Sequence, residues 1–318
     1  MSNAFVVIVG VLDKVGSTNI PMAASFTKFG IQVLPVNYRT IISKQGMQFF
    51  GDYLLFIIKK YNPILTLFSK CNGVDTNIIK ECGKHSVTWL FNMDPRPTIE
   101  RCPEVIDHAF NSHFSSCTAK DMVEWFESFG VKNCYHIIQG IDQNVFKPVE
   151  PVDEFKADIS HIGTKTEERD QFKKVLEDAG FVTKFYGTGY SSKEMFGNDF
   201  NEICASSKFM LSMNTYNNIH QEYFSNRLLR YVACGVCTLH YDSTNSLDKY
   251  LTNGKEVLYF KDSNELVNIL KNITDEKACE IAMVGRDKAL NNYTWDRIIY
   301  DMLERVKREG KKADVAVG

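Results

Sequence analysis

Short apolar runs alternate with amphipathic stretches through most of the chain. The apolar runs have the length of strands and lie at residues 5–9, 31–36, 64–68, 86–91, 134–138, 158–162, 182–186, 209–213, 236–239 and 257–260. Stretches with a helical period separate them, at residues 18–29, 47–61, 75–82, 118–129, 167–179, 201–206, 264–271, 276–290 and 295–308. We also expect a short strand at 108–111 and a short helix at 245–251. Because strands that alternate with helices are typical of parallel sheets, the pattern predicts an α/β protein.

The alternation stops between residues 140 and 155. Pro148, Pro151 and several acidic residues follow one another there without a helical period, as in an extended linker. The predicted parts are a domain at 1–140, a linker at 141–155, a second domain at 156–292, a C-terminal helix at 293–308 and a frayed tail at 309–318. We expect two Rossmann-like parallel-sheet domains that face each other across a cleft. The fold class also allows the C-terminal helix to cross back to the first domain.

Composition narrows the class of protein. The chain has 318 residues, of which 44% are hydrophobic, enough for a sizeable core. Its formal charge of −2 predicts no general affinity for nucleic acid or anionic membranes. No apolar run approaches the roughly 20 residues of a membrane span, and the first residues lack the features of a signal peptide. The 9 scattered cysteines fit reduced thiols, so we predict a cytoplasmic protein and interpret Cys234 and Cys237 as buried packing residues.

Residues 220–240 are predicted to form a loop, a helix, a glycine stop and a buried strand. Ser225 is placed to cap the helix with its hydroxyl, and Gly235 ends it. Arg227 falls in the first turn, beside free backbone amides and the positive end of the helix dipole. A guanidinium there matches phosphate oxygens, so this is a candidate anion site. The alternative is a solvated arginine on an ordinary helix.

Glycine-bearing loops follow or flank strand ends in the second half, around residues 163, 187 and 225. Backbone amides exposed in such loops bind a diphosphate without much positive side-chain charge. A nucleotide or nucleotide-sugar site follows from this arrangement. Gly10 and Gly16, after the first strand, do not match the dinucleotide-binding fingerprint.

Asp94 is the candidate general base. It stands in a loop with two prolines directly after the strand at 86–91, and a rigid loop can hold a carboxylate within reach of a proton. The alternative is a common Asp-Pro turn that bonds its own backbone. His113, in a later polar loop, is a weaker candidate for a base or a substrate contact.

Several motifs in the second half share order and spacing with a known family. They are 158–164 (Asp-Ile-Ser-His-Ile-Gly-Thr), 186–190 (Tyr-Gly-Thr-Gly-Tyr), 211–214 (Leu-Ser-Met-Asn), Asn226-Arg227 with 233–235 (Ala-Cys-Gly), 251–260 and 293–297. This half resembles the CgeB/YkvP-type, spore-protein-like glycosyltransferases of the two-domain GT-B fold. The linker, with 140–142 and 146–148, also looks like that of GT-B enzymes. The resemblance covers residues 140–305 and is weaker over 1–139.

The resemblance implies an enzyme that moves a sugar from a nucleotide-diphosphate donor, expected to be UDP-linked, to an acceptor, with no metal or cofactor. The donor would lie on the second domain and the acceptor mainly on the first. The expected donor diphosphate contacts are Ser225, Asn226, Arg227 and Arg230. The expected nucleotide contacts are Gly163, Thr164, Gly187, Thr188, Tyr190 and Asn214. On the acceptor side we expect Gly16, Ser17, Arg96 and His113, with Asp94 as the base if the reaction inverts the sugar.

One position departs from the family pattern. Three residues after the motif arginine the family usually carries a glutamate, which can bind the ribose hydroxyls, and here that position is Arg230. One helical turn places Arg227 and Arg230 on the same face. The ribose is then held otherwise, or Arg230 assists the phosphates, or it pairs with an acid such as Glu222. The change also leaves open that catalysis is lost.

The acceptor and the function class stay open. A composition rich in Ile, Asn, Lys, Phe and Tyr suits an AT-rich genome such as that of a phage, whose enzyme would work in the host cytoplasm on a modified DNA base. A basic open face with Lys14, Arg39, Lys44 and Arg96 would support DNA, and an aromatic-lined cleft would favour a glycan or small molecule. The alternatives are a non-catalytic nucleotide-sugar-binding protein and a structural protein with a vestigial cleft. We predict no membrane contact and no obligate protein partner.

Overall fold

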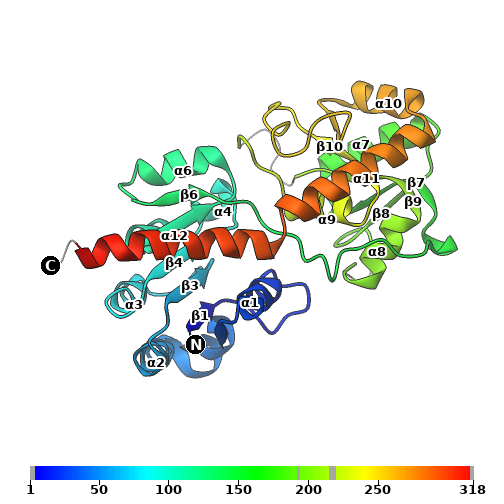
Figure 1. Ribbon diagram of the computed structural model, residues 1–318. Helices are drawn as coiled ribbons and strands as arrows, with labels where there is room; N and C mark the ends of the chain where they lie inside the picture. Colours follow the sequence, from blue (N-terminus) through cyan, green and yellow to red (C-terminus); the bar gives the residue numbers. More distant parts are fainter. Residues whose placement is uncertain (1–3, 192–193, 215–219, 316–318) are drawn as a thin grey trace. The chain divides into compact units, whose positions relative to one another are not determined.

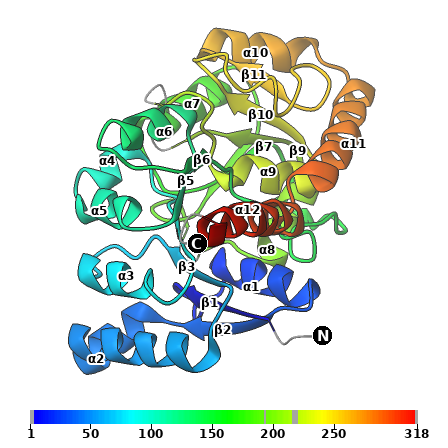
Figure 2. The ribbon, with the colours of Figure 1, turned by 60° about the vertical axis from the view of Figure 1, so that its left-hand side comes forward.

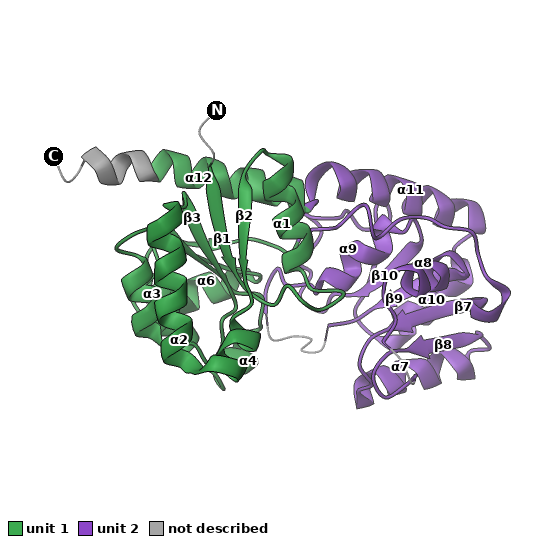
Figure 3. Cartoon of the chain, turned by 90° about the horizontal axis from the view of Figure 1, so that it is seen from below, with its two compact units in different colours: residues 1–139, 295–318 green, residues 140–294 purple. Residues whose placement is uncertain are grey.

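The computed structural model describes residues 4–191, 194–214 and 220–315, with side chains described up to residue 309. The chain divides into two compact units (Figure 3). Unit 1 comprises the chain up to Gln139 together with the part from Trp295 onward, and unit 2 comprises Gly140–Thr294.

Unit 1 is built on a six-stranded parallel sheet in the order β2-β1-β3-β4-β5-β6 (Figure 1). Its strands are β1 Phe5–Val9, β2 Gln32–Val36, β3 Leu65–Ser69, β4 Thr88–Phe91, β5 Phe114–Cys117 and β6 Cys134–His136. The central strands β3, β4 and β5 are buried along their whole length. This explains the mostly apolar sequences of β3 and β4, whereas β5 carries two buried serines, Ser115 and Ser116.

The helices of unit 1 cover this sheet. They are α1 Asn19–Lys28, α2 Tyr38–Tyr61, α3 Thr76–Cys82, α4 Arg96–Ile99, α5 Glu104–Phe110, α6 Lys120–Glu127 and α12 Trp295–Val315. The last helix, α12, packs beside α1 (Figure 2), and Trp295 joins the same hydrophobic core as Phe26. Asp296 fastens it further, since its carboxylate accepts a hydrogen bond from Ser25 at 2.7 Å and pairs with Lys28. The C-terminal helix therefore belongs to the first unit.

Unit 2 contains a five-stranded parallel sheet in the order β11-β10-β9-β7-β8. Its strands are β7 Ala157–Ile162, β8 Thr183–Tyr186, β9 Ser207–Ser212, β10 Cys237–Tyr241 and β11 Leu258–Phe260. A 3-10 turn, η1 Asp153–Phe155, precedes the first strand. The helices are α7 Glu167–Asp178, α8 Asn198–Ala205, α9 Asn226–Ala233, α10 Ser263–Asn272 and α11 Asp275–Asn292. The prediction of two parallel-sheet domains is confirmed.

Both sheets reverse their strand order at the first strand of the unit. In unit 1 the strand β1 lies between β2 and β3, and in unit 2 the strand β7 lies between β8 and β9. The loops that leave these strands diverge at the carboxyl edge, which we define as the edge formed by the carboxyl ends of the parallel strands. Ligands of open α/β sheets bind at this edge, where the order reverses.

Two predicted elements are wrong. The expected strand at 108–111 is the end of α5, because Val105, His108 and Ala109 repeat at helical spacing and are buried together. The expected helix at 245–251 is a series of turns, because the Asp242 carboxylate accepts hydrogen bonds from the backbone of Thr244 and Leu247 and holds the chain in a loop. Among the described helices, none combines the length and apolar character needed to cross a membrane.

Candidate active site

Two arginines converge on one carbonyl at the carboxyl edge of unit 2. Arg227 is the second residue of α9, and its Nη1 donates a hydrogen bond to the Met213 carbonyl at 2.7 Å. Arg169, in the first turn of α7, donates to the same carbonyl from Nη2 at 2.9 Å and to the Thr164 carbonyl from Nη1. The loops that follow β7 and β9 are thus joined by two guanidinium groups.

No carboxylate neutralises these two charges within the described residues. Neither Arg227 nor Arg169 takes part in any ion pair found there, although Arg169 is only 1% exposed. Burial, and then the nearby charge of Arg227, lowers the pKa of Arg169 to about 10. Because a buried cation without a partner is costly, an anion bound at this edge would stabilise it.

Two buried histidines lie in the strands beneath the arginines. His161 of β7 places Nδ1 at 2.8 Å from the Leu211 carbonyl, and His240 of β10 places Nδ1 at 2.8 Å from Ser212 Oγ. The carbonyl partner requires a proton on Nδ1 of His161, so its Nε2 is an acceptor. Burial, followed by the charge of Arg227, lowers the pKa of both imidazoles, that of His240 to about 3. Both rings are therefore uncharged at neutral pH and do not repel the guanidiniums.

The predicted glycines permit this close packing. A Cβ on Gly163 would lie 2.7 Å from His161 Nε2 and 2.8 Å from Arg227 Nη2. Gly187 has a positive φ of 104°, and a Cβ there would lie 2.7 Å from the Gly163 carbonyl oxygen. The two loops therefore meet with no room for a side chain.

The other predicted nucleotide contacts tie the same loops together. The amide of Lys165 donates to the Thr188 carbonyl at 2.7 Å, which links the loops after β7 and β8. Tyr190 donates from its hydroxyl to Asp170 at 2.8 Å, and burial raises the pKa of that hydroxyl. Thr164 contributes its carbonyl to Arg169. Their contact with a nucleotide stays a prediction.

The start of α9 lacks the capping hydrogen bond that was expected from Ser225. Ser225 occupies the N-cap position, but its hydroxyl makes no capping bond, so that prediction is wrong. Its backbone amide instead donates to Asn214 Oδ1 at 2.9 Å, while Asn214 Nδ2 donates to the Tyr223 carbonyl at 3.1 Å. Asn214 thus holds the chain that leads into α9, where Asn226 is the first helical residue. Its expected nucleotide contact stays a prediction.

Arg230 lies one turn after Arg227 and stacks on aromatic rings. Its guanidinium carbon is 4.7 Å from the centre of the Phe146 ring and 5.9 Å from that of Phe196. Burial and the charge of Arg227 lower the pKa of Arg230 to about 10. The alternative pairing with Glu222 is wrong, because the Glu222 carboxylate binds Lys249 and the Tyr250 hydroxyl, and no ion pair of Arg230 is found in the described part of the chain.

Asp94 lies at the carboxyl edge of unit 1, after β4. Lys70 binds its Oδ1, and Asn72 Nδ2 lies 3.5 Å from its Oδ2. Asn92 brackets its backbone, because the Asn92 side chain accepts from the Asp94 amide at 3.3 Å and donates to the Asp94 carbonyl at 2.9 Å. The carboxylate is therefore fixed in place, with Lys70 on one oxygen and the longer contact of Asn72 on the other.

The backbone that presents Lys70 is strained. Lys70 and Cys71 have positive φ angles of 63° and 59° in succession, directly after β3. A non-glycine residue in this left-handed region costs roughly 1–2 kcal/mol, and such strain gathers at functional sites. Lys70 and Asn72 were not singled out from the sequence.

The acceptor-side residues are scattered over unit 1. Gly16 (φ 84°) and Ser17 lie in the loop between β1 and α1, where Ser17 Oγ donates to the Val11 carbonyl. Arg96 begins α4, bonds Glu100 at 2.9 Å and stacks over Trp125 at 4.9 Å.

His113 is placed wrongly by the sequence prediction. It precedes β5, and its Nδ1 accepts from the Thr88 amide at 3.2 Å, at the amino end of β4. It therefore lies at the opposite edge of the sheet from Asp94. The prediction failed because a polar loop before a strand and one after a strand look alike in sequence.

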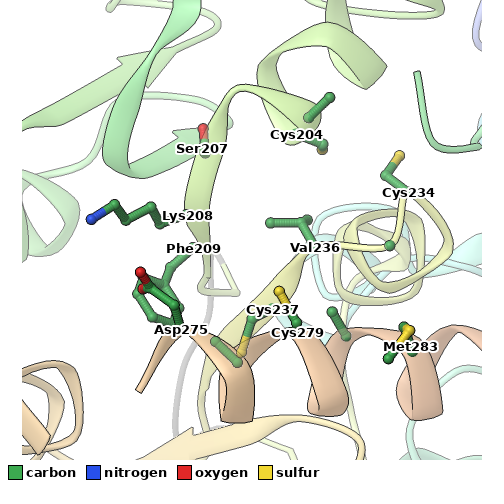
Figure 4. A pocket seen from close by; sticks show the side chains of 14 residues that line it. Cys204, Ser207, Lys208, Phe209, Cys234, Val236, Cys237, Asp275, Cys279 and Met283 are labelled. Carbon is green, nitrogen blue, oxygen red and sulfur yellow. The ribbon is translucent and has the colours of Figure 1, made fainter. Parts of the chain in front are cut away.

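A groove of about 490 Å³ opens at the amino edge of unit 2, the edge formed by the amino ends of the strands (Figure 4). Arg169 and Arg227 do not line it. It is lined by the beginnings of β9 and β10 and by α11, with four cysteines, Cys204, Cys234, Cys237 and Cys279. Cys234 and Cys237 are buried, as expected, and burial raises the pKa of Cys237 to about 12. The groove shares no residue with the carboxyl edge.

Comparison with known proteins supports the fold. Residues 164–304, less than half of the chain, match a family described as "Glycosyl transferase-like". No curated protein shows significant sequence similarity. Sucrose-phosphate synthase from Thermosynechococcus elongatus is similar in structure, with a TM-score of 0.64, 12% identity, and coverage of 98% of this chain and 100% of that one.

Two further solved structures have the same architecture. Trehalose-6-phosphate synthase OtsA gives a TM-score of 0.68 at 9% identity, covering 96% of this chain and 99% of that one. A DNA-modifying β-glucosyltransferase, solved with and without uridine diphosphoglucose, gives 0.59 at 14% identity, covering 95% and 99%. The chain has the GT-B fold of glycosyltransferases. Metal independence stays a prediction.

Proposed function

We propose that the protein is a glycosyltransferase that takes a sugar from a nucleotide-diphosphate donor. The observation that carries this proposal is the pair Arg169 and Arg227, two guanidiniums on one carbonyl that form no ion pair in the described part of the chain. A diphosphate would supply the missing negative charge. The finer resemblance, to the CgeB/YkvP-type enzymes, is part of this proposal, as is a UDP-linked donor.

Unit 2 would hold the leaving group. The first-turn amides of α9 and the positive end of its dipole face the same edge as Arg227, and helix N-termini bind phosphate groups in this way. Charge develops on the diphosphate as the sugar leaves, so fixed cations at this place stabilise the transition state more than the ground state. Arg169 and Arg227 would perform this task.

The reaction would take place between an acceptor hydroxyl and the anomeric carbon. The hydroxyl oxygen bonds to that carbon, the bond from the carbon to the diphosphate oxygen breaks, and the diphosphate leaves with the electron pair. In an inverting reaction the hydroxyl proton passes to Asp94, whose Oδ2 is the oxygen not bound by Lys70.

A second candidate function is a nucleotide-sugar-binding protein without turnover. The position of Arg230 favours it, since this residue stacks on Phe146 and Phe196 instead of presenting a group for a ribose diol. Binding of a nucleotide sugar without any transfer, unchanged by Asp94→Asn, would support this function.

Thermal unfolding against a panel of nucleoside diphosphates and nucleotide sugars tests the donor site. A ligand at 100 times its Kd adds about 2.7 kcal/mol of stability, which raises the melting temperature by about 5 °C or more for units of this size. We expect one base family to stabilise the wild type and Arg308→Ala, a control at an exposed arginine of α12, but not Arg227→Ala. No shift with any diphosphate would contradict the donor site.

A further inference from the structure

Two acids at the carboxyl edge of unit 1 are engaged by neighbours. Asp94 contacts Lys70 and Asn72, and Asp13 accepts a hydrogen bond from the Thr40 hydroxyl at 2.8 Å. Hydrogen bonds from Asn37 and Thr40 lower the pKa of Asp13. Both carboxylates therefore already have donors.

Several other side-chain oxygens at this edge have no hydrogen-bond donor. Asn19 and Asn72 use the amide nitrogen as a donor, to the Val11 carbonyl at 3.1 Å and to Asp94 Oδ2 at 3.5 Å. These bonds indicate which end of the two amides is the oxygen. The Oδ1 atoms of Asn19, Asn37 and Asn72 are buried and have no partner among the described residues. The hydroxyl oxygen of Ser69 is also buried and has no partner among the described residues.

These unpartnered oxygens belong to adjacent loops. Asn19 begins α1 after β1, Asn37 follows β2 and Asn72 follows β3, and these strands are neighbours in the order β2-β1-β3. Gly10 brings two of them together, since a Cβ there would lie 2.5 Å from Asn19 Nδ2 and 3.3 Å from Ser69 Cβ. Asp94 follows the next strand, β4.

An acceptor oxygen buried without a donor costs about 1–3 kcal/mol, and several at one edge are unusual in a folded protein. The left-handed turn at Lys70 and Cys71 adds strain at the same place. A ligand that supplies several donors would relieve this cost. Asn37 and Asn72 are only partly buried residues, so they lie within reach of such a ligand.

We propose that the sugar acceptor is a neutral polyhydroxyl compound, a saccharide or polyol, and that Asn37, Asn72 and Asp94 receive its hydroxyl groups. A phosphate backbone offers acceptors, which do not match the unpaired oxygens. A saccharide hydroxyl donates, and it also provides the oxygen that attacks the anomeric carbon. Transfer to this compound rests on the proposed function, whereas its binding does not.

Saturation-transfer NMR on the full chain, with UDP present, tests the acceptor class. The probes are a panel of neutral saccharides (glucose, N-acetylglucosamine, maltose and cellobiose), inorganic phosphate and a short DNA duplex. We expect a saccharide to bind the wild type, and Asn72→Leu and Asn37→Leu to raise its Kd at least about 10-fold, equal to about 1.4 kcal/mol. Asn111→Leu, in the loop before β5 at the amino edge, is the matched control and should leave the Kd unchanged.

A purely structural role would predict the opposite pattern in stability. Asn72→Leu removes an unpartnered buried acceptor and only one long bond, the 3.5 Å contact with Asp94, so its melting temperature should stay close to that of the wild type. Asn72→Ala serves as the second variant if leucine is not accommodated. Its Kd for the saccharide should rise in the same way.

The outcomes separate the two proposals. If UDP binds but no saccharide of the panel does, or if the DNA duplex or phosphate binds instead, the acceptor inference is overturned while the donor site stands. It is equally overturned if a saccharide binds all variants alike. If UDP fails to bind the wild type, the donor site falls, and saccharide binding lost in Asn72→Leu would still support the polyhydroxyl site.

Discussion

The carboxyl edges of the two sheets have the same topology and opposite polar chemistry. In each unit the first strand lies between two later ones, so diverging loops carry the polar residues. Unit 2 places Arg169 and Arg227 there without an ion pair in the described part of the chain, whereas unit 1 pairs Lys70 with Asp94 and leaves amide oxygens without donors. The fold places a site, and a few residues after each strand decide whether it suits an anion or a hydroxyl group.

The largest effect should come from Asp94→Asn. If the two edges perform separate tasks, this change abolishes proton acceptance in unit 1 and leaves the diphosphate site of unit 2 intact. We expect the transfer rate to fall by about 10²- to 10⁴-fold, the usual contribution of a general base. The affinity for UDP, measured by calorimetry, should not change. Asp52→Asn, at an exposed acid of α2, is the control. Full activity in Asp94→Asn would mean that Asp94 is not the base.

The fold could be predicted from the sequence because burial gives each helix or strand a characteristic pattern of apolar residues. Fully buried strands such as residues 65–69 appear as mostly apolar runs, and a glycine follows the end of helices such as α3, α7 and α9. A local pattern cannot distinguish two structures that share it. Residues 108–111 are an example, because their apolar residues fit one turn of helix as well as a strand. The Asp242 loop was missed because side-chain bonds to the backbone leave no periodic signal.

Residues of the candidate site could be predicted only where a short stretch of sequence indicates their position. Gly163 follows a predicted strand and Arg227 falls in the first turn of a predicted helix, so their placement could be inferred. His161 and His240 were missed, although each is a polar residue inside an otherwise apolar strand, which is the signal that would have found them. Lys70 and Arg169 could not be assigned partners, because their contacts join loops from strands that are adjacent only in the folded sheet.

The buried histidines of unit 2 should make stability depend on pH, and burial lowers the pKa of His108 and His113 in unit 1 in the same direction. A histidine whose pKa is lowered on folding binds fewer protons in the folded than in the unfolded state, so stability is lost as the pH falls below about 6.5. With a folded pKa of about 3, His240 should remove about 2 kcal/mol between pH 7 and pH 5. Urea unfolding of the wild type and His240→Gln at both pH values measures this difference. An equal pH dependence in the two proteins would show that His240 is not buried in the neutral form.

The smallest effect should be that of Lys70→Gly on stability, and it separates function from folding at the edge of unit 1. Glycine relieves the left-handed strain of roughly 1–2 kcal/mol, while the change removes a half-exposed ion pair of about 0–1 kcal/mol and adds about 0.5–1 kcal/mol of backbone entropy. The free energy of unfolding should therefore stay within about 1 kcal/mol of the wild type. Lys70→Met keeps the strain and loses the ion pair, so it should be the less stable of the two in chemical denaturation. If Lys70 is held in a strained turn to position Asp94, both variants should shift the pH profile of sugar transfer, even though only one of them weakens the fold. A residue with a merely structural role would leave that profile unchanged.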